Sequence, residues 1–346
     1  MTNLEKRNLI EMIGIVVIGR NEGNRLKICL NSVLKYGSNI VYVDSGSEDG
    51  SIKLARELDV RVVELDLSTP FCAARARNTG VRVLNSLEAE IKYVQFVDGD
   101  CEVDEQWMES ARLFLETHDD VAVVSGRLRE RHPEKSVYNL LCDVEWNAPV
   151  GEAISCGGLA MMRLDVFNSL GGYKDDITAG EEPELCMRIR NKGFKIWRLE
   201  NEMALHDSAM FHFSQWWNRN RRTGYGAMDL TIRFSHPNFK RIILRVLSWT
   251  LWALMVLLFS TLSLLDEKVS FNIIVYFLLA LWPINLLRVV FKTWRAGKSI
   301  KFSFIYAWYM AIGILPQALG IASYISDKFH QRQLRLIEHK IHKPKK

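Results

Sequence analysis

Two long apolar segments near the C-terminus constrain the fold of this chain more than any other feature of its sequence. Residues 242–265 and 271–291 are almost wholly hydrophobic, and each is long enough to cross the hydrocarbon core of a bilayer, which requires roughly 20 residues. The preceding sequence instead alternates short apolar runs with charged stretches. We therefore expect a water-facing domain over residues 1–235, a hydrophobic membrane region over 236–325 and a basic tail over 326–346.

A third apolar segment, residues 302–325, has two possible placements. It is long enough to span a membrane, but its second half contains Gly313, Pro316, Gln317 and Gly320. If it spans, the basic tail lies outside the cell, against the tendency of Lys and Arg to stay in the cytosol. A re-entrant or interfacial helix pair keeps the tail cytosolic, and we favour that alternative over a third crossing.

Charge and cysteine content indicate that the large domain faces the cytosol. Loop 292–301 is basic, whereas loop 266–270 has little net charge, so the positive-inside tendency puts the N-terminal domain on the cytosolic side of the cell membrane. The six cysteines include no CxxC pair, which suits a reducing compartment. The basic tail suits an anionic membrane surface, and the domain has no aromatic-interleaved basic patch that would indicate a nucleic-acid partner.

Apolar runs and amphipathic stretches alternate through the N-terminal domain. We expect strands at 13–18, 39–43, 60–65 and 91–97, and helices at 26–34, 51–58 and 73–87 between them. Further strand-like runs lie at 121–125 and 158–162, and a helix is expected at 183–191. This alternation predicts an α/β fold with a mostly parallel sheet and helices on both faces.

Polar residues follow three of the expected strands. Asn21 and Glu22 follow the first, Asp44 ends the second, and Asp98 and Asp100 follow the fourth. Ligands of open α/β sheets bind at the carboxyl ends of the strands, so we expect these side chains to converge. Two carboxylates on one loop offer hard oxygen ligands to Mg²⁺ or Mn²⁺, although acidic loops without a metal are common. Asp44 is suited to bind a nucleobase or ribose, and its alternative role is a helix N-cap.

Five motifs occur in a fixed order along about 180 residues. They are Asn-Glu at 21–22, Val-Asp-Ser-Gly-Ser-Glu-Asp-Gly at 43–50, Ala-Arg-Asn-Thr-Gly at 76–80, Asp-Gly-Asp at 98–100 and Gly-Glu-Glu-Pro-Glu-Leu at 180–185. Together they resemble the motifs of family 2 glycosyltransferases, which have the GT-A Rossmann-like fold. The resemblance implies a metal-dependent enzyme that uses Mg²⁺ or Mn²⁺ and a nucleoside-diphosphate sugar. It implies donor contacts from Asn21, Glu22, Asp44, Arg77, Asn78 and Asp98.

The resemblance also implies a catalytic base. An inverting transfer needs one group to take the proton of the acceptor hydroxyl, and the family usually has Glu-Asp before a helix, where this chain has Glu181 and Glu182. Glu182 is then the base and Glu181 its neighbour, with Glu in place of the usual Asp. The alternative is that acidic residues simply favour a helix start through the helix dipole.

Two further elements have more than one interpretation. GT-A enzymes often complete the metal shell with a downstream histidine, so the resemblance makes His206 a third metal ligand beside Asp98 and Asp100; a structural histidine is the alternative. Residues 215–222 loosely resemble an element of processive members, but the order of residues differs, so processivity does not follow. Arg219 and Arg222 in this segment suit the departing diphosphate or, with the neighbouring tryptophans, the lipid headgroups.

We therefore expect an inverting glycosyltransferase whose acceptor is associated with the membrane, such as a lipid-linked glycan, a polyprenyl phosphate or a polysaccharide. A nucleotidyltransferase shares such a sheet, but its Gly-rich, Arg-containing loop is poorly matched by residues 19–23. A catalytically inactive glycan-binding or scaffold subunit is the alternative from another class. The intact Asp98, Asp100 and Glu182 argue against it.

Overall fold

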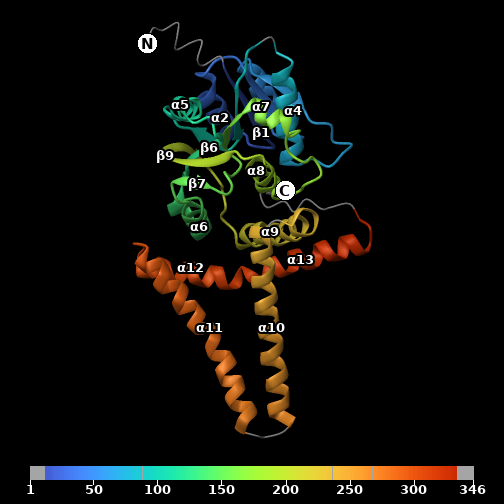
Figure 1. The fold of residues 1–346 in the computed structure, drawn as a ribbon, viewed down its shortest axis with the longest axis vertical. Coiled ribbons are helices and arrows are strands. Elements are labelled where there is room, and N and C mark those ends of the chain that lie inside the picture. The colour runs from blue at the N-terminus through green and yellow to red at the C-terminus, as the bar shows by residue number, and fades with distance from the viewer. Residues whose placement is uncertain (1–11, 88, 236, 266–268, 333–346) are drawn as a thin grey trace. The chain divides into compact units, whose positions relative to one another are not determined.

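The chain divides into two units, Met1–His212 and Phe213–Lys346. The computed structural model describes residues 12–87, 89–235, 237–265 and 269–332. The first unit is α/β and the second is helical (Figure 1). The division lies before α9 (Phe213–Phe234), so α9 belongs to the helical unit, whereas the expected water-facing domain extends to residue 235.

The strands described in the first unit form one nine-stranded sheet. In spatial order they are β3 (Arg61–Glu64), β2 (Ile40–Asp44), β1 (Ile13–Gly19), β4 (Tyr93–Asp98), β8 (Ala160–Arg163), β6 (Val121–Glu130), β9 (Lys195–His206) and β5 (Cys101–Val103), with β7 (Gly151–Ala153) also paired to β9. The pairs from β3 through β4 are parallel. Strand β8 runs antiparallel to β4 and β6, and β6 is parallel to β9. The predicted α/β fold is confirmed, and antiparallel pairing is confined to the second half of the sheet and its edge strands.

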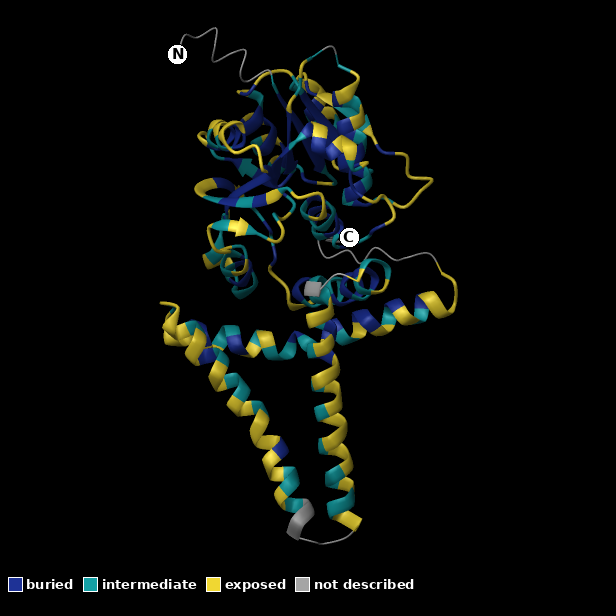
Figure 2. Cartoon of the chain, viewed as in Figure 1, coloured by how far each residue is buried: buried dark blue, intermediate teal, exposed yellow. Residues whose placement is uncertain are grey.

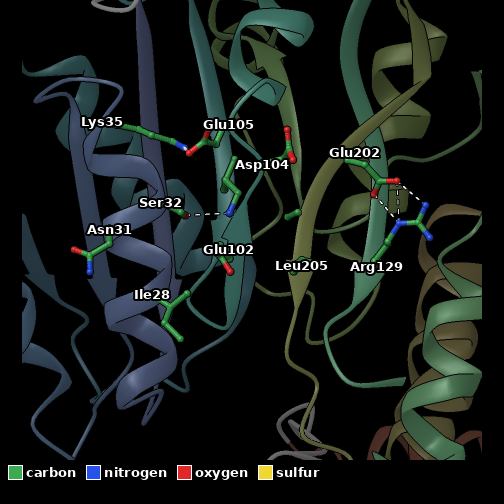
Figure 3. Close-up of a pocket in the computed structure, with 12 residues that line it drawn as sticks. Ile28, Asn31, Ser32, Lys35, Glu102, Asp104, Glu105, Arg129, Glu202 and Leu205 are labelled. Carbon is green, nitrogen blue, oxygen red and sulfur yellow. Dashed lines mark hydrogen bonds and ion pairs between the residues drawn. The ribbon is translucent and has the colours of Figure 1, made fainter. Parts of the chain in front are cut away.

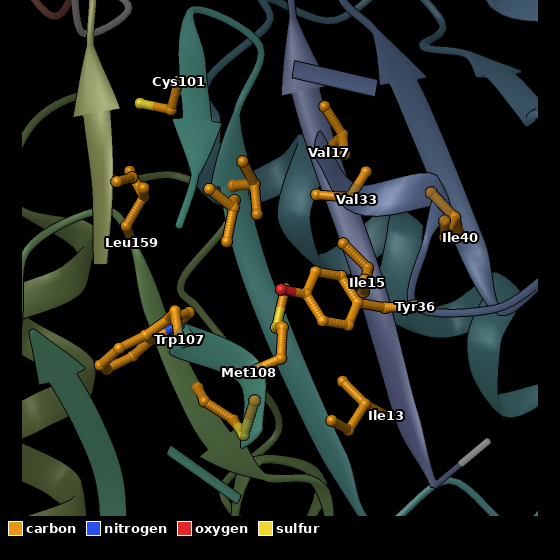
Figure 4. Close-up of a cluster of buried hydrophobic side chains, with 14 of the residues drawn as sticks. Ile13, Ile15, Val17, Val33, Tyr36, Ile40, Cys101, Trp107, Met108 and Leu159 are labelled. Atoms are coloured by element: carbon orange, nitrogen blue, oxygen red, sulfur yellow. The ribbon is translucent and has the colours of Figure 1, made fainter. Parts of the chain in front are cut away.

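Alternation along β1 explains why both faces of the sheet carry helices. Side chains of a strand point to opposite faces in turn. Ile13, Ile15 and Val17 pack against one set of helices, as Figure 4 shows for the buried cluster on that face, and Val16 and Ile18 pack against the other set. The first set is α2 (Asn24–Leu34), α3 (Ser51–Glu57) and α5 (Trp107–Thr117); the second is α4 (Ala73–Asn85), α7 (Leu164–Ser169) and α8 (Glu181–Asn191).

The first four strands and their helices match the predicted ranges closely, but the second half of the domain contains more structure than expected. Strand β6 continues to Glu130, well beyond residue 125. Helix α8 begins at Glu181, two residues before the predicted start at Pro183. The elements beyond those predicted are β5, β7, β9, α5, α7, η1 (Pro133–Lys135) and α6 (Val137–Glu145).

The second unit contains α9, α10 (Pro237–Leu265), α11 (Val269–Arg295), α12 (Ile300–Ile312) and α13 (Ile314–Phe329). Three helical stretches, Phe239–Leu265, Asn272–Arg295 and Ile300–Phe329, are long and apolar enough to cross a membrane. Their mean hydropathies are 2.2, 2.1 and 1.5, and only 11% of the first two is buried against protein. Figure 2 shows exposed residues along most of α10 and α11, as expected of helices whose apolar side chains face lipid.

The third stretch is divided at Gly313 into α12 and α13. These two helices lie nearly in line with each other and run across α10, not alongside it (Figure 1). Helix α13 packs against α9 so closely that a Cβ atom on Gly224 or Gly320 would lie 2.1 Å from a backbone oxygen of the other helix. Buried hydrogen bonds join the same helices, from Tyr225 to Asp327 at 3.3 Å and from Tyr324 to Asp229 at 3.1 Å.

Candidate active site

Strand register brings the polar residues of three strand ends together. Gly19, the last residue of β1, is paired with Asp44 of β2, and Ile18 is paired with Asp98 of β4. Because these three strands are parallel, the loops that follow them leave from the same edge of the sheet. The predicted convergence of the loops at 21–22, 44–50 and 98–100 therefore occurs at this edge.

The loop after β2 is organised around Asp44, which is fully buried. Its Oδ1 accepts hydrogen bonds from the backbone N–H groups of Gly46 and Ser47, and its Oδ2 accepts from the hydroxyls of Tyr42 and Ser47. These four bonds use the acceptor capacity of the carboxylate. In this structure Asp44 therefore shapes the loop, and any nucleotide contact would exchange one of these partners.

Asn21 and Glu22 connect the first loop to its surroundings. The backbone N–H of Asn21 donates to Ser47 Oγ at 2.9 Å, and its side-chain Oδ1 accepts from the N–H of Glu48 at 2.7 Å. Glu22 is buried and forms an ion pair of 2.7 Å with Arg25. Asn21 thus ties the first and second loops together at the sheet edge.

Arg77 on α4 joins two carboxylates that are far apart in sequence. Its guanidinium contacts Asp98 Oδ1 at 3.0 Å and Glu181 Oε1 at 2.9 Å, while only 3% of its side chain is exposed. Burial alone would lower the pKa of Arg77, but the negative charges, led by Asp98, raise it above its ordinary value. A planar guanidinium suits two carboxylates at once, so Arg77 brings the Asp-Gly-Asp loop and the start of α8 into one site.

Asn78, the next residue on α4, faces a different segment. Its amide nitrogen donates to Tyr173 O at 2.8 Å and to Asp175 Oδ1 at 2.6 Å, and its oxygen accepts from the N–H of Tyr173. These contacts hold residues 173–175 against α4. The predicted donor role of Asn78 would therefore be indirect, through the position of that loop.

Asp100 directly precedes β5, His206 is the last residue of β9, and their side chains are in contact. His206 Nε2 lies 3.1 Å from Asp100 Oδ2, and both side chains are largely buried. Nδ1 of His206 is buried and has no hydrogen-bond partner among the described residues, and the ring packs edge-on against Trp146. A carboxylate oxygen and an imidazole nitrogen in contact fit a divalent cation such as Mn²⁺. Asp98 instead forms an ion pair with Arg77, and 30% of its side chain is exposed.

Glu182, the predicted base, lies beside two thiols. Its Oε1 accepts hydrogen bonds from the backbone N–H of Cys156 at 2.6 Å, from Cys156 Sγ at 3.2 Å and from Cys186 Sγ at 2.9 Å. Burial raises the pKa of Glu182 above its ordinary value, and these hydrogen bonds partly oppose the rise. A carboxylate with a raised pKa is better matched to general-base catalysis near neutral pH.

Two predicted donor contacts are not part of this group. Arg219 and Arg222 lie on α9, in the helical unit, whereas the residues described above all belong to the first unit. Their contribution to donor binding therefore stays a prediction.

A separate pocket of about 690 Å³ lies between α2, β5 and β9. Figure 3 shows its lining, with Lys35 directed towards Glu105 and Arg129 paired with Glu202. Leu205 of this lining directly precedes His206 on β9, but successive residues of a strand face opposite sides of the sheet. None of the predicted site residues lines the pocket, so it is distinct from the candidate active site.

The loop that connects β7 to β8 also reaches the site, and no sequence motif predicts it. Within it, Cys156 contacts Glu182, and a Cβ atom on Gly158 would lie 2.8 Å from Arg77 Nη2 and 3.2 Å from Asp98 Oδ2. Only glycine allows the loop to pass this close to the Arg77 pair. No sequence spacing links this loop to Asp98 or Glu182, because the contacts arise from long-range folding.

Two family models and two curated relatives match this chain. A model of Glycosyl transferase family 2 matches residues 14–171, and one of Glycosyl transferase family group 2 matches residues 93–312, more than half of the chain. The chain is 23% identical over 259 residues to Glycosyltransferase AglE of Haloferax volcanii, covering 71% of this chain and 81% of that protein. It is 24% identical over 208 residues to Succinoglycan biosynthesis protein ExoA of Rhizobium meliloti, covering 56% of this chain and 62% of that protein.

Among solved structures, the chain resembles Mannosyltransferase PcManGT from Pyrobaculum calidifontis in complex with GDP-Man and Mn²⁺. The TM-score is 0.53 at 16% sequence identity, and the superposition covers 93% of this chain and 88% of that one. This likeness shows a shared fold.

Proposed function

Because the chain belongs to the family 2 glycosyltransferases, we propose that it transfers a sugar from a nucleoside-diphosphate sugar to an acceptor at the cytosolic face of the cell membrane. The transfer inverts the anomeric carbon. The observation that carries the proposal is the bridge made by Arg77, which links Asp98 of the metal motif to Glu181, next to the proposed base Glu182.

The site residues divide the reaction among them. Asn21, Glu22 and Asp44 form the nucleotide side through the two loops that Asn21 connects. Asp100 and His206 would hold Mg²⁺ or Mn²⁺, whose chemistry there is to neutralise the charge of the diphosphate, and Asp98 would join them as a ligand by exchanging its contact with Arg77. Glu182 takes the proton of the acceptor hydroxyl. Glu181 and Asn78 position Arg77 and residues 173–175, respectively.

The names of relatives support a carbohydrate product. AglE is named a glycosyltransferase and ExoA a succinoglycan biosynthesis protein, and PcManGT was solved with GDP-Man and Mn²⁺. The lipid-facing α10 and α11 favour an acceptor that is itself associated with the bilayer. We propose a lipid-linked glycan, a polyprenyl phosphate or a growing polysaccharide as the acceptor, and a multi-pass protein with its α/β unit in the cytosol.

Thermal-shift measurements on the detergent-solubilised full chain test this proposal. We expect one nucleoside diphosphate to stabilise the protein in the presence of Mn²⁺ and much less without it, since a ligand at 100 times its Kd adds about 2.7 kcal/mol to stability. The variant Asp100→Asn should lose the Mn²⁺-dependent part of this shift and the transfer activity. Failure of every nucleoside diphosphate to shift the melting temperature, together with no hydrolysis of any nucleotide sugar, would favour a scaffold protein.

A further inference from the structure

Two cysteine thiols meet at the proposed base. Cys156 comes from the loop between β7 and β8, and Cys186 lies one helical turn after Glu182 on α8. Their sulfur atoms are 3.6 Å apart, and both contact the same oxygen of Glu182. Neither thiol belongs to a disulfide, and nothing in the proposed transfer reaction uses them.

The donor set of this group differs from that of Asp100 and His206. One ligand atom from each of Cys156, Glu182 and Cys186 lies within 4.8 Å of the other two. Thiolate sulfur binds soft and borderline cations such as Zn²⁺ and Cd²⁺ and is a poor ligand for Mg²⁺. Two thiolates and one carboxylate also leave a fourth tetrahedral position for water, as in open zinc sites.

We propose that Cys156, Glu182 and Cys186 form a binding site for a thiophilic divalent cation of the Zn²⁺ class. The consequence for the reaction rests on the proposed function: a Glu182 carboxylate that coordinates such a cation no longer accepts the acceptor's proton. The site is therefore inhibitory and separate from the activating Mg²⁺ or Mn²⁺ site.

The proton balance of binding favours such a site. Each thiol donates a hydrogen bond to Glu182 Oε1, so both protons already lie between the atoms that would become ligands. On binding, two S–H bonds break, two sulfur–metal bonds form and two protons leave for solvent. Two thiols and a carboxylate carry one negative charge, and two thiolates, a carboxylate and a divalent cation carry the same charge. The buried region thus gains no net charge.

Neighbouring groups hold the ligands in place and leave a way in. The backbone N–H of Cys156 donates to Glu182 Oε1 at 2.6 Å, which fixes the carboxylate, and hydrogen bonds of this kind orient metal ligands. Cys186 and Glu182 are buried, whereas Cys156 is partly exposed. A cation can therefore arrive through the loop that carries Cys156.

The test compares metal binding with activity in the reduced, metal-free full chain in detergent. Cd²⁺ should produce an ultraviolet thiolate-to-metal charge-transfer band, and Zn²⁺ should compete for it. Cys156→Ser and Cys186→Ser should each weaken binding by at least about tenfold, the lower end of the loss seen for altered metal shells. Cys142→Ser, a change of a buried cysteine outside the group, is the matched control.

The second measurement is inhibition of transfer. With Mn²⁺ in excess, Zn²⁺ should inhibit the parent and Cys142→Ser but not the double variant Cys156→Ser/Cys186→Ser, each relative to its own uninhibited rate.

Three outcomes would overturn the site. The charge-transfer band could persist unchanged in the double variant, or Zn²⁺ could inhibit the double variant as strongly as the parent. Alternatively, two of the titratable thiols could disappear from the metal-free protein, which would indicate that Cys156 and Cys186 form a disulfide. The binding signal does not depend on sugar transfer. Intact binding in a protein that transfers no sugar would therefore support the site and overturn the proposed function instead.

Discussion

Arg77 bridges two carboxylates of the site. Its side chain is almost completely buried between Asp98 and Glu181, and these two carboxylates balance its charge. Removing one partner from a buried ion pair leaves an uncompensated charge, which is more damaging than replacing the pair as a whole. We therefore expect Arg77 to stabilise the site and to hold the 98–100 loop near the start of α8.

Replacement of Arg77 should lower stability as well as activity. Arg77→Met leaves two carboxylates without their cation and is expected to cost about 3–5 kcal/mol, a fall in melting temperature on the order of 10 °C for a unit of this size. Arg77→Lys should recover only part of this, because an ammonium group cannot match the two-pronged geometry. Arg82→Met, an exposed change on the same helix, is the control. Equal melting temperatures for the two Met variants would contradict the bridge.

Glu182→Gln should keep donor binding and lose transfer. The amide preserves size and polarity but cannot take the proton of the acceptor, and removal of a general base typically lowers the rate by about 10²- to 10⁴-fold. Steady-state rates and nucleotide affinity measured on the same preparation separate the two effects. Glu181→Gln should be milder in rate but should lower the melting temperature, since Glu181 pairs with Arg77. An essential Glu181 beside a dispensable Glu182 would assign the base to the other residue.

The pH profile should reflect the environment of Glu182. Burial raises its pKa, so the deprotonated base is lost, as pH falls, at a higher pH than for an ordinary glutamate of pKa about 4.3. The acid limb of the transfer rate should therefore lie above that value. Cys186 lowers the pKa through its hydrogen bond, so Cys186→Ala should move the acid limb further upward. If the acid limb of the Cys186→Ala profile coincides with that of the parent, a group other than Glu182 titrates there.

At the scale of elements, the sequence predicted the parts of the sheet whose strands are continuous apolar runs. Strands β1, β2 and β4 are buried on both faces, so their composition alone identified them. Strand β9 carries exposed Glu200, Asn201 and Glu202 in its middle, which removes the alternation that marks a strand. The pairing of β9 with β6 and the contact of Cys156 with Glu182 join residues that are far apart in the sequence, so no local pattern predicts them.

The packing of α9 on α13 depends on two glycines. A Cβ atom on Gly320 would lie 2.1 Å from Arg221 O, and one on Gly224 would lie 2.1 Å from Gln317 O. Close helix contacts of this kind need small residues at the crossing point. This packing also explains why α9 belongs with the helical unit, which its amphipathic sequence did not reveal.

Gly320→Ala should therefore separate the two helices. The added methyl group meets a backbone atom that cannot rotate away, so we expect a lower melting temperature and faster proteolysis within residues 213–234. Ala322→Val, which adds more carbon at an exposed position of the same helix, is the matched control and should behave like the parent. A Gly320→Ala protein as stable as that control would mean that the helices tolerate a wider spacing.

At the scale of the whole molecule, the membrane topology depends on α12 and α13. Composition alone gives three candidate crossings, but the third is less hydropathic and 33% of it is buried against protein. A helix that crosses a bilayer next to others exposes most of its apolar surface to lipid, and most apolar side chains of α10 and α11 are exposed. The break at Gly313 and the packing of α13 on α9 instead favour helices that lie at the membrane surface.

We expect two crossings and a C-terminus in the cytosol. A reporter fused after Lys346 should therefore read cytosolic, as should one inserted at Gly297 in the basic loop after α11, while a reporter inserted at residue 267 should read extracytosolic. The insertion at 267 is the internal control, because it reports the opposite side whether or not α12 and α13 span. An extracytosolic signal after Lys346, with the other two unchanged, would establish three crossings and remove the surface placement of α12 and α13. A reversal of all three would instead put the α/β unit, and with it the proposed donor site, on the side of the membrane opposite to the cytosol.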